Sequence, residues 1–320
     1  MTSGSTTTET DYIVNLILED SVLLQLHTAE GRIVANRVGA EYDYQYQYVL
    51  KDHLGNSRVT FGATEQQYLA TMESELAGQE EAQFENIADY RVKDFQYNHT
   101  PGGAYTPDES VMLNANLTVN GTRRVVGAAK GLKIQAGDTV DMEVWAKYPS
   151  TCGVSETTAS AYLFTALTSG LGIVSTGETS QAYTAMNSLL GTTTLIDQSP
   201  CDRPSAYLNY IFFDENYANP VVGFQQVGSS SDTFQKLSLS FAASTAGYLY
   251  IYVSNESSLD VFVYFDDMKF TVKCDLSVIQ AVDYFPFGLS MAGTCFKLLG
   301  SKENKFLYQG QELQDDLDLG

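Results

Sequence analysis

The chain has 320 residues, with 39 acidic against 18 basic side chains and a formal charge of −21. Such an acidic chain repels phosphate backbones and anionic lipid surfaces, which argues against nucleic acids and membrane surfaces as partners. No apolar run is long enough to span a membrane, so we expect no membrane insertion. The 21 tyrosines and 16 phenylalanines favour β-structure, and the length suffices for two domains.

The N-terminal part of the chain predicts a mobile leader followed by a β-hairpin. Residues 1–10 are polar and rich in Ser and Thr, and residues 11–26 are rich in Ile, Val and Leu with loose alternation. A Glu30–Gly31 turn closes the first hairpin. His27 and His53 lie at predicted turns with no Ser or Cys motif nearby, so we expect structural or solvated roles for both.

A tyrosine-rich strand comes next. Tyrosines occupy every second position from 42 to 48, and side chains alternate faces along a strand, so all four tyrosines share one face. A turn at 52–56 and a second strand at 57–61 complete a hairpin. We predict that the tyrosine face is buried and that Asp43, Gln45 and Gln47 face water. The predicted partners of the tyrosines are Tyr284, Phe285, Phe287, Phe306 and Tyr308.

Beyond residue 63 the pattern changes to a series of short strands. The acidic stretch 64–85 predicts a short linking helix, and Pro-Gly-Gly and Asn-Gly turns separate the strand-like segments after it. Strands are predicted near 90–97, 111–119, 124–134, 139–148, 206–214, 234–243, 247–254 and 260–272. Strands at this spacing predict a two-sheet sandwich of the jelly-roll type. Apolar spacing in 160–172 and 180–191 adds one or two short helices.

Three segments carry a family resemblance: LKDHLGNSRVTF (50–61), DYFPFG (283–288) and KFLYQGQELQD (305–315). Together they resemble the core segment of RHS/YD-repeat proteins in the form found in Bacteroidetes. The resemblance implies a β-hairpin shell, here residues 11–63 and 276–320, interrupted by an inserted sandwich at 64–275. The family usually continues where this chain ends, so we expect a fragment or truncated copy. The implied partners are the rest of the shell and a C-terminal effector outside the chain, on a secreted or cell-surface protein.

No nucleophile, metalloprotease or nucleotide-binding motif is present, and the family's Asp-Pro self-cleavage motif is absent. We therefore expect a non-catalytic structural segment that encloses or presents an effector, with a sandwich for glycan or partner contact. A carbohydrate- or protein-binding adhesin module is the alternative, and a carbohydrate-active enzyme is the weaker one. Aromatic side chains available as a sugar platform are Trp145, Tyr105, Tyr162 and Tyr207. For Trp145, packing in the core is the competing interpretation.

The segment VFVYFDDMKFTV (261–272) resembles the last strand of galactose-binding-like carbohydrate-binding modules. That resemblance implies a structural calcium ion held by Glu85, Asp266 and Asp267, since hard carboxylate oxygens suit calcium. A solvated Asp pair is the alternative, and no other cofactor is expected. Cys152 and Cys201 lie in similar loops, so either they form a disulfide or all four cysteines are free thiols.

Overall fold

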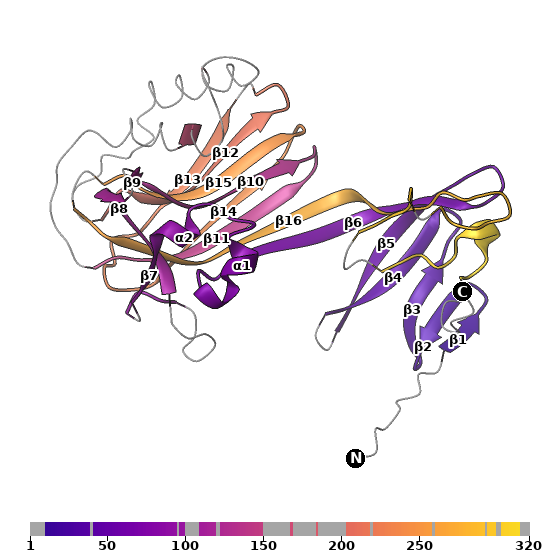
Figure 1. Ribbon diagram of the computed structural model, residues 1–320. Coiled ribbons are helices and arrows are strands. Elements are labelled where there is room, and N and C mark those ends of the chain that lie inside the picture. Colours follow the sequence, from indigo (N-terminus) through magenta and orange to yellow (C-terminus); the bar gives the residue numbers. More distant parts are fainter. Residues whose placement is uncertain are drawn as a thin grey trace. The chain divides into compact units, whose positions relative to one another are not determined.

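The computed structural model describes residues 10–38, 41–94, 96–99, 109–119, 122–149, 167–168, 184, 203–217, 220–257, 260–291, 293–298 and 302–313. The chain forms two compact units (Figure 1). Unit 1 comprises Met1–Glu65 and Lys273–Gly320, and unit 2 comprises Gln66–Val272. In the part of the chain described, no helix is long and apolar enough to cross a membrane.

Unit 1 is an antiparallel sheet whose strands follow one another in chain order. The strands are β1 (Thr10–Ile13), β2 (Leu16–Glu19), β3 (Val22–His27), β4 (Gly31–Val38), β5 (Glu41–Lys51) and β6 (Ser57–Ala70). The turn between β5 and β6 is closed by Asp52, whose Oδ1 accepts the backbone N–H groups of Leu54 at 2.9 Å and Asn56 at 3.0 Å. Gly55 has a φ of +84°, which a side chain would strain.

Around Gln47 the packed face of this sheet is the opposite of the one predicted, whereas Asp43 is exposed as expected. Tyr42, Tyr44 and Tyr48 are 41%, 49% and 43% exposed, whereas Gln47 is only 4% exposed. The expectation of a buried tyrosine row with Gln47 in water is therefore wrong. The physical reason is Arg32 on β4, which pairs in register with Gln47 and is buried on the same face. A buried guanidinium needs acceptors, and Gln47 supplies one.

The C-terminal segment of unit 1 lies on this polar face. Arg32 donates to Gln47 Oε1 at 2.8 Å, to Gln25 Oε1 at 2.7 Å and to the carbonyl of Lys302 at 3.0 Å. Further along, the backbone N–H of Ser57 donates to the carbonyl of Leu307 at 2.8 Å. This segment holds β17 (Phe296–Lys297), which pairs with the end of β16 (Val263–Ala281), and the 3-10 turn η2 (Tyr308–Gly310).

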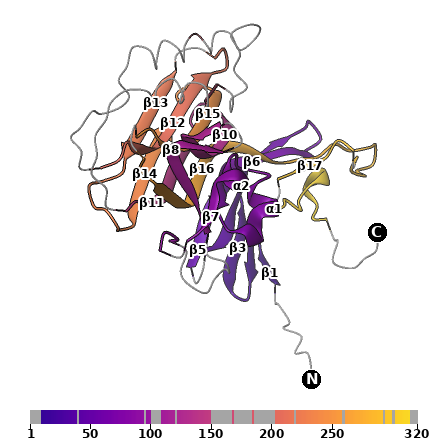
Figure 2. The same cartoon turned by 60° about the vertical axis from the view of Figure 1, so that its left-hand side comes forward.

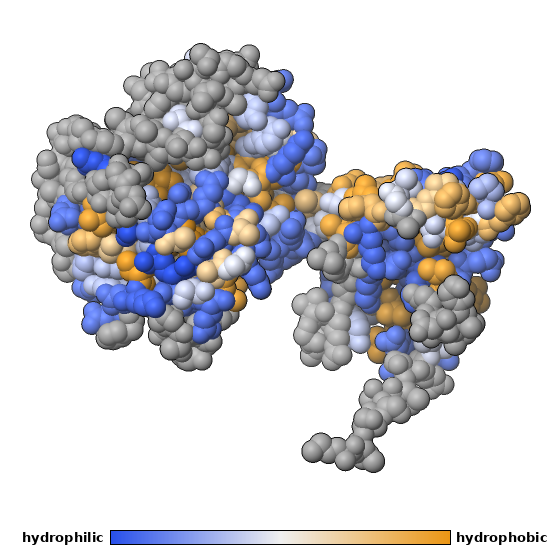
Figure 3. All heavy atoms as spheres, viewed as in Figure 1, coloured by the Kyte–Doolittle hydropathy of each residue, from blue (hydrophilic) through white to orange (hydrophobic). Residues whose placement is uncertain are grey.

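The later aromatic side chains consequently make contacts other than those predicted. Phe306 lies edge-on to His27, with ring centroids 4.3 Å apart, and Tyr284 lies against Tyr308 at 5.8 Å. The tyrosines of β5 contact each other and Phe61 instead. Hydrophobic residues remain exposed in this part of unit 1 (Figure 3), among them Phe287 at 96%.

Unit 2 is a two-layer β-sandwich (Figures 1 and 2). One sheet has the order β10 (Val126–Ile134), β15 (Gly247–Asn255), β12 (Ala206–Asp214), β13 (Val221–Gln226). The other is formed by β16 (Val263–Ala281), β11 (Thr139–Lys147), β14 (Gln235–Ala242), β8 (Glu109–Val119), β7 (Arg91–Lys93) and β9 (Thr122–Arg124). Phe241 of β14 contacts Tyr210 and Phe212 of β12, both at 5.1 Å, and so joins the two layers.

The mainly β, antiparallel architecture expected from the sequence is confirmed, and most predicted sandwich strands lie where expected. β13 was missed. The short linking helix predicted within 64–85 is present as the 3-10 turn η1 (Ser74–Leu76) and α1 (Ala77–Glu80), although β6 occupies the first part of that stretch. A second short helix, α2 (Ile87–Tyr90), follows it. The expected helices at 160–172 and 180–191 lie outside the described residues except for 167–168 and 184, which are helical. Cys152 and Cys201 also lie outside them, and Cys274 and Cys295 are free thiols.

Candidate functional site

A half-exposed surface covers the outer side of β11, β14 and β16. Along β11 the side chains alternate strictly between buried and half-buried, so Val144 and Ala146 enter the core while Trp145 and Lys147 face outward. Trp145 is thus not a core residue. We call this surface the Trp145 face. Its aromatic side chains are Tyr97, His99, Trp145, Phe234 and Tyr264, and its polar side chains are Asp141, Glu143, Lys147, Lys236, Ser238, Ser240, Lys269 and Thr271.

Loop residues 96–99 lie flat on the aromatic half of this face. The ring of His99 stacks on Trp145 with centroids 3.9 Å apart and planes at 12°, and Tyr97 stacks on Tyr264 at 3.9 Å and 10°. The ammonium group of Lys147 lies 5.2 Å from the ring centroid of Tyr97 and 4.9 Å from that of Phe234. All five aromatic side chains remain partly exposed. Rings held in parallel planes form a rigid, partly wet aromatic surface.

Buried carboxylates hold the loop in this position. Asn98 Nδ2 donates to Glu73 Oε1 at 2.8 Å and to the carbonyl of Glu109 at 3.0 Å. The backbone N–H of His99 donates to Asp266 Oδ2 at 2.6 Å, and the His99 ring pairs with Asp267 at 2.8 Å. Burial raises the pKa of Asp266 to about 8. The loop is therefore fixed by specific hydrogen bonds as well as by ring stacking.

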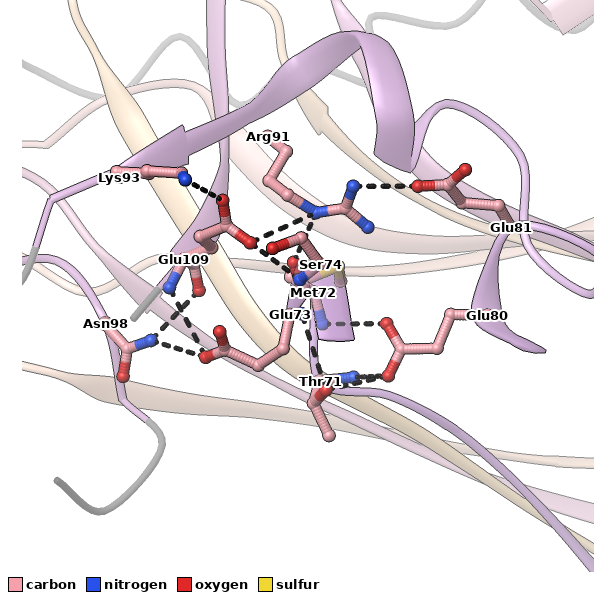
Figure 4. A network of polar contacts seen from close by, with 10 residues as sticks. All are labelled: Thr71, Met72, Glu73, Ser74, Glu80, Glu81, Arg91, Lys93, Asn98 and Glu109. Atoms are coloured by element: carbon pink, nitrogen blue, oxygen red, sulfur yellow. Dashed lines mark hydrogen bonds and ion pairs between the residues drawn. The ribbon is translucent and has the colours of Figure 1, made fainter. Parts of the chain in front are cut away.

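Asn98 and Glu73 belong to a larger polar network (Figure 4). Glu80 accepts the backbone N–H groups of Thr71 at 2.7 Å and Met72 at 3.1 Å. Glu109 accepts the backbone N–H of Ser74 at 2.6 Å and pairs with Lys93. Arg91 links the carbonyl of Met72 to Glu81, at 2.7 Å in each case. Residues 71–74 are thereby tied to β7 and β8, which gives the loop a stable base.

An open polar groove occupies the other half of the Trp145 face. Glu143 bridges Lys236 at 2.5 Å and Lys269 at 3.5 Å, and the Lys236 hydrogen bond is the main cause of its lowered pKa. Asp141 accepts the hydroxyl of Ser240 at 2.8 Å. Trp145 lies directly opposite Lys236 in the β11–β14 register, so the groove adjoins the aromatic half. Ring faces and hydrogen-bonding groups therefore share one surface.

The three predicted calcium ligands have different partners in the structure. Glu85 Oε2 accepts the hydroxyl of Tyr250 at 2.9 Å, and its backbone pairs with Ala129. Asp266 and Asp267 instead bind His99. Among the described residues, no group of three or more His, Cys, Asp or Glu side chains is arranged to hold a metal ion. The calcium ion stays a prediction, and chelation can test it.

The sequence identified only part of this site. Trp145 was singled out, but Tyr207 is 2% exposed on the other sheet, and Tyr105 and Tyr162 lie outside the described residues. Tyr97, His99, Phe234 and Tyr264 were missed. Alternation in 261–272 places Tyr264 opposite the buried Phe265, which was a usable signal, whereas nothing local indicates where Tyr97 and His99 pack.

Comparisons with known proteins leave the family open. No protein-family model matches the chain, and no curated protein matches it. A match among solved structures is the CBM22-1–GH10 module pair of Clostridium thermocellum xylanase 10B complexed with xylohexaose, at 11% identity and TM-score 0.30. It covers 59% of this chain and 25% of that one, so this chain spans about a quarter of that length.

Two further matches are equally distant. A family 16 carbohydrate binding module has 7% identity and TM-score 0.26, with 53% of this chain and 81% of that one covered. A cyclase from Fischerella sp. TAU has 7% identity and TM-score 0.28, with 70% and 78% covered. At these identities and TM-scores the comparisons assign neither a family nor a function to the chain. The structure itself shows the class of fold, a mainly β sandwich.

Proposed function

We propose that unit 2 is a non-catalytic binding module that takes a glycan on the Trp145 face. One observation carries this proposal: half-exposed, parallel aromatic rings adjoin a groove of hydroxyl, carboxylate and ammonium side chains on one rigid sheet. Sugar rings present apolar C–H faces edged by hydroxyl groups. Such a ligand matches a surface that offers ring faces and hydrogen-bonding groups side by side.

Unit 1, in this proposal, is a scaffold piece of the RHS/YD type that carries the module. The support is the three sequence segments, together with the side-by-side exit and return of the chain. β6 leaves unit 1 near Thr64, β16 returns near Ser277, and the two hydroxyls are 3.0 Å apart. An insertion into a hairpin shell has this geometry. The proposed partners are the remaining shell and an effector outside this chain, on a secreted or cell-surface protein.

Glycan binding is tested with the full chain on a glycan array, followed by calorimetric titration of the best ligand. Trp145→Ala should weaken binding by about tenfold to a hundredfold, since buried Trp contacts dominate binding energies. Lys236→Ala should weaken it less. Lys236→Ala should retain the thermal unfolding profile of the wild type because its side chain is exposed. Trp145→Ala removes the stacking contact with His99 and should lower the melting temperature slightly, with the sandwich still folded.

The control is Tyr44→Ala, which removes an aromatic ring of unit 1 that is more exposed than Trp145. It should leave glycan affinity unchanged. An array without hits would contradict glycan binding. A ligand whose affinity is unchanged by Trp145→Ala and reduced by Tyr44→Ala would show that the glycan does not bind to the Trp145 face.

A further inference from the structure

The long axis of the Trp145 face runs along β11. Side chains two positions apart on a strand point to the same side, and Asp141, Glu143, Trp145 and Lys147 all face outward. Four such positions span about 20 Å at about 3.3 Å per residue, whereas the adjacent strands β16, β11 and β14 are only about 10 Å wide from axis to axis. A ligand that uses the whole face must therefore be long and narrow.

The β11–β14 register divides this face into rows whose chemistry changes along the strand. The opposite pairs are Trp145 with Lys236, Glu143 with Ser238, and Asp141 with Ser240. Among the described residues that line the groove at the Asp141 end, none is aromatic. A ligand lying along β11 would therefore stack one end on the rings and place its remaining length over hydroxyl and charged groups.

The groove has the room and the hydrogen-bonding groups for sugar units. Its volume is about 550 Å³, within the range of about 300–1,000 Å³ that is usual for ligand sites. Ser238 and Ser240 are exposed, and Thr271 is half-exposed. In the described part of the chain, the hydroxyl groups of Ser238 and Thr271 have no hydrogen-bond partner. Both groups can therefore bind sugar hydroxyls without breaking a bond within the protein.

The charges in and beside the groove cancel. The ammonium groups of Lys236 and Lys269 both pair with Glu143, and the second carboxylate, Asp141, accepts the hydroxyl of Ser240. An anionic sugar would have to displace Glu143 from its lysines and would also be repelled by the formal charge of −21 on the chain. A cationic sugar would be repelled by the two ammonium groups. A neutral ligand leaves both ion pairs in place.

We propose that the glycan bound by the Trp145 face is a neutral, linear oligosaccharide that lies along β11. One sugar ring stacks at the aromatic end, and the following units lie over the hydroxyl groups of Ser238, Ser240 and Thr271. This inference rests on the proposed glycan binding and adds the charge, the shape and the direction of the ligand. Because each further unit adds hydrogen bonds, affinity should rise with chain length until the groove is filled.

The first test is calorimetric titration of the full chain with linear β-linked oligosaccharides of glucose, mannose and xylose, from the single sugar to the hexasaccharide. At least one series should bind, with a gain of about tenfold or more between the disaccharide and the tetrasaccharide. Glucuronate and mannuronate oligomers and glucosamine oligomers of the same linkage are the anionic and cationic controls, and should bind about tenfold more weakly or not at all. A tenfold rise in salt concentration should leave the affinity for the neutral ligand unchanged.

These outcomes separate the present proposal from glycan binding itself. If no oligosaccharide binds, neutral or charged, the glycan-binding role fails and this inference fails with it. If a charged oligomer binds more tightly than its neutral counterpart, or if the single sugar binds as tightly as the tetrasaccharide, only the present proposal is overturned.

Two variants then test the direction of the ligand. Ser238→Ala and Thr271→Val remove hydroxyl groups from outward positions, so the sandwich should stay folded. Each should weaken the tetrasaccharide severalfold and leave the disaccharide unchanged, whereas Trp145→Ala should weaken both ligands equally. Ser244→Ala, which removes an exposed hydroxyl group between β14 and β15, is the matched control and should change neither affinity. If both groove variants bind the tetrasaccharide like the wild type, the ligand does not lie along β11 and the proposal is overturned.

Discussion

Gln47 shows how one buried polar contact decides which face of a sheet is packed. Its Oε1 accepts Arg32 Nε at 2.8 Å, and burial lowers the pKa of Arg32 to about 10 while leaving it charged at neutral pH. Gln47→Ala removes an acceptor from a buried cation, which should destabilise unit 1 by about 1–3 kcal/mol. Urea unfolding monitored by tyrosine fluorescence measures the change.

Gln45→Ala is the matched control on the same strand and face. Gln45 is half-exposed, and within the described part of the chain its side chain bonds only to the exposed Asp43, at 3.2 Å. Its truncation should therefore change stability by less than about 0.5 kcal/mol. If Gln47→Ala and Gln45→Ala lower the unfolding free energy by the same amount, the hydrogen bond from Arg32 to Gln47 does not contribute to the stability of unit 1. The alternation of β5 is predicted correctly from its residues, but alternation alone does not reveal which face meets the C-terminal segment 302–313.

Glu256 sets a pH window for the stability of unit 2. Its pKa is raised by burial from 4.5 to about 7, so the folded state holds a proton that the unfolded state releases. The stabilisation is fully present below pH 4.5 and is lost as the pH rises through 7. Glu256→Gln has no such loss. The variant should gain stability relative to wild type across this window, by at most about 3 kcal/mol, measured by denaturant melts at a series of pH values. A constant difference across the series would contradict the raised pKa.

At the scale of elements, the loop 96–99 depends on its anchor. Asn98 Nδ2 joins the loop to Glu73 and to the carbonyl of Glu109. Asn98→Ala should lower the unfolding free energy by about 1 kcal/mol and reduce glycan affinity severalfold, because Tyr97 and His99 lose their fixed positions. Gln96→Ala is the control, since its exposed side chain is not used in the anchor. If Asn98→Ala and Gln96→Ala have the same glycan affinity, the position of the loop does not contribute to glycan binding.

Chelation tests the predicted calcium ion at the same place. If Glu85, Asp266 and Asp267 hold calcium, EDTA should lower the melting temperature of a calcium-loaded sample, and added calcium should restore it. Glu85→Gln should abolish this response if Glu85 is a ligand. Because the structure pairs Glu85 with Tyr250 and Asp267 with His99, Asp267→Asn is a needed second variant. A calcium-loaded protein that melts identically with and without EDTA would rule the ion out.

Local sequence signals explain why most strands were predicted and β13 was not. β11 alternates strictly, as a half-buried strand does, whereas β12 and β15 are mostly apolar along their length, as fully buried strands are. β13 reads VVGFQQ, a short segment with a central glycine. Gly223 is required there because a Cβ would lie 2.4 Å from the ring of Tyr210. The need for glycine at this position comes from the neighbouring strand, so it produces no recognisable pattern in the sequence of β13 itself. The stacking of His99 on Trp145 is likewise not visible in the sequence around either residue.

For the whole molecule, the two units should unfold separately. Unit 2 contains most of the large, fully buried side chains, including Leu113, Met142, Phe213, Phe265 and Phe270. Unit 1 relies on a few buried apolar residues and on the Arg32 contacts. A fragment spanning 66–272 therefore has its own core and should melt in one cooperative transition, whereas unit 1 should be the less stable part.

Calorimetry of the full chain and of the 66–272 fragment measures this difference. The full chain should show two transitions, and the upper one should coincide with that of the fragment. Met142→Ala, which removes a side chain 1% exposed, should lower only the upper transition, by about 2–5 kcal/mol of unfolding free energy, and Gln47→Ala should lower only the lower one. A single transition in the full chain that both variants shift equally would show one cooperative unit. A broad, non-cooperative melt of the fragment would show that the sandwich needs the scaffold in order to fold.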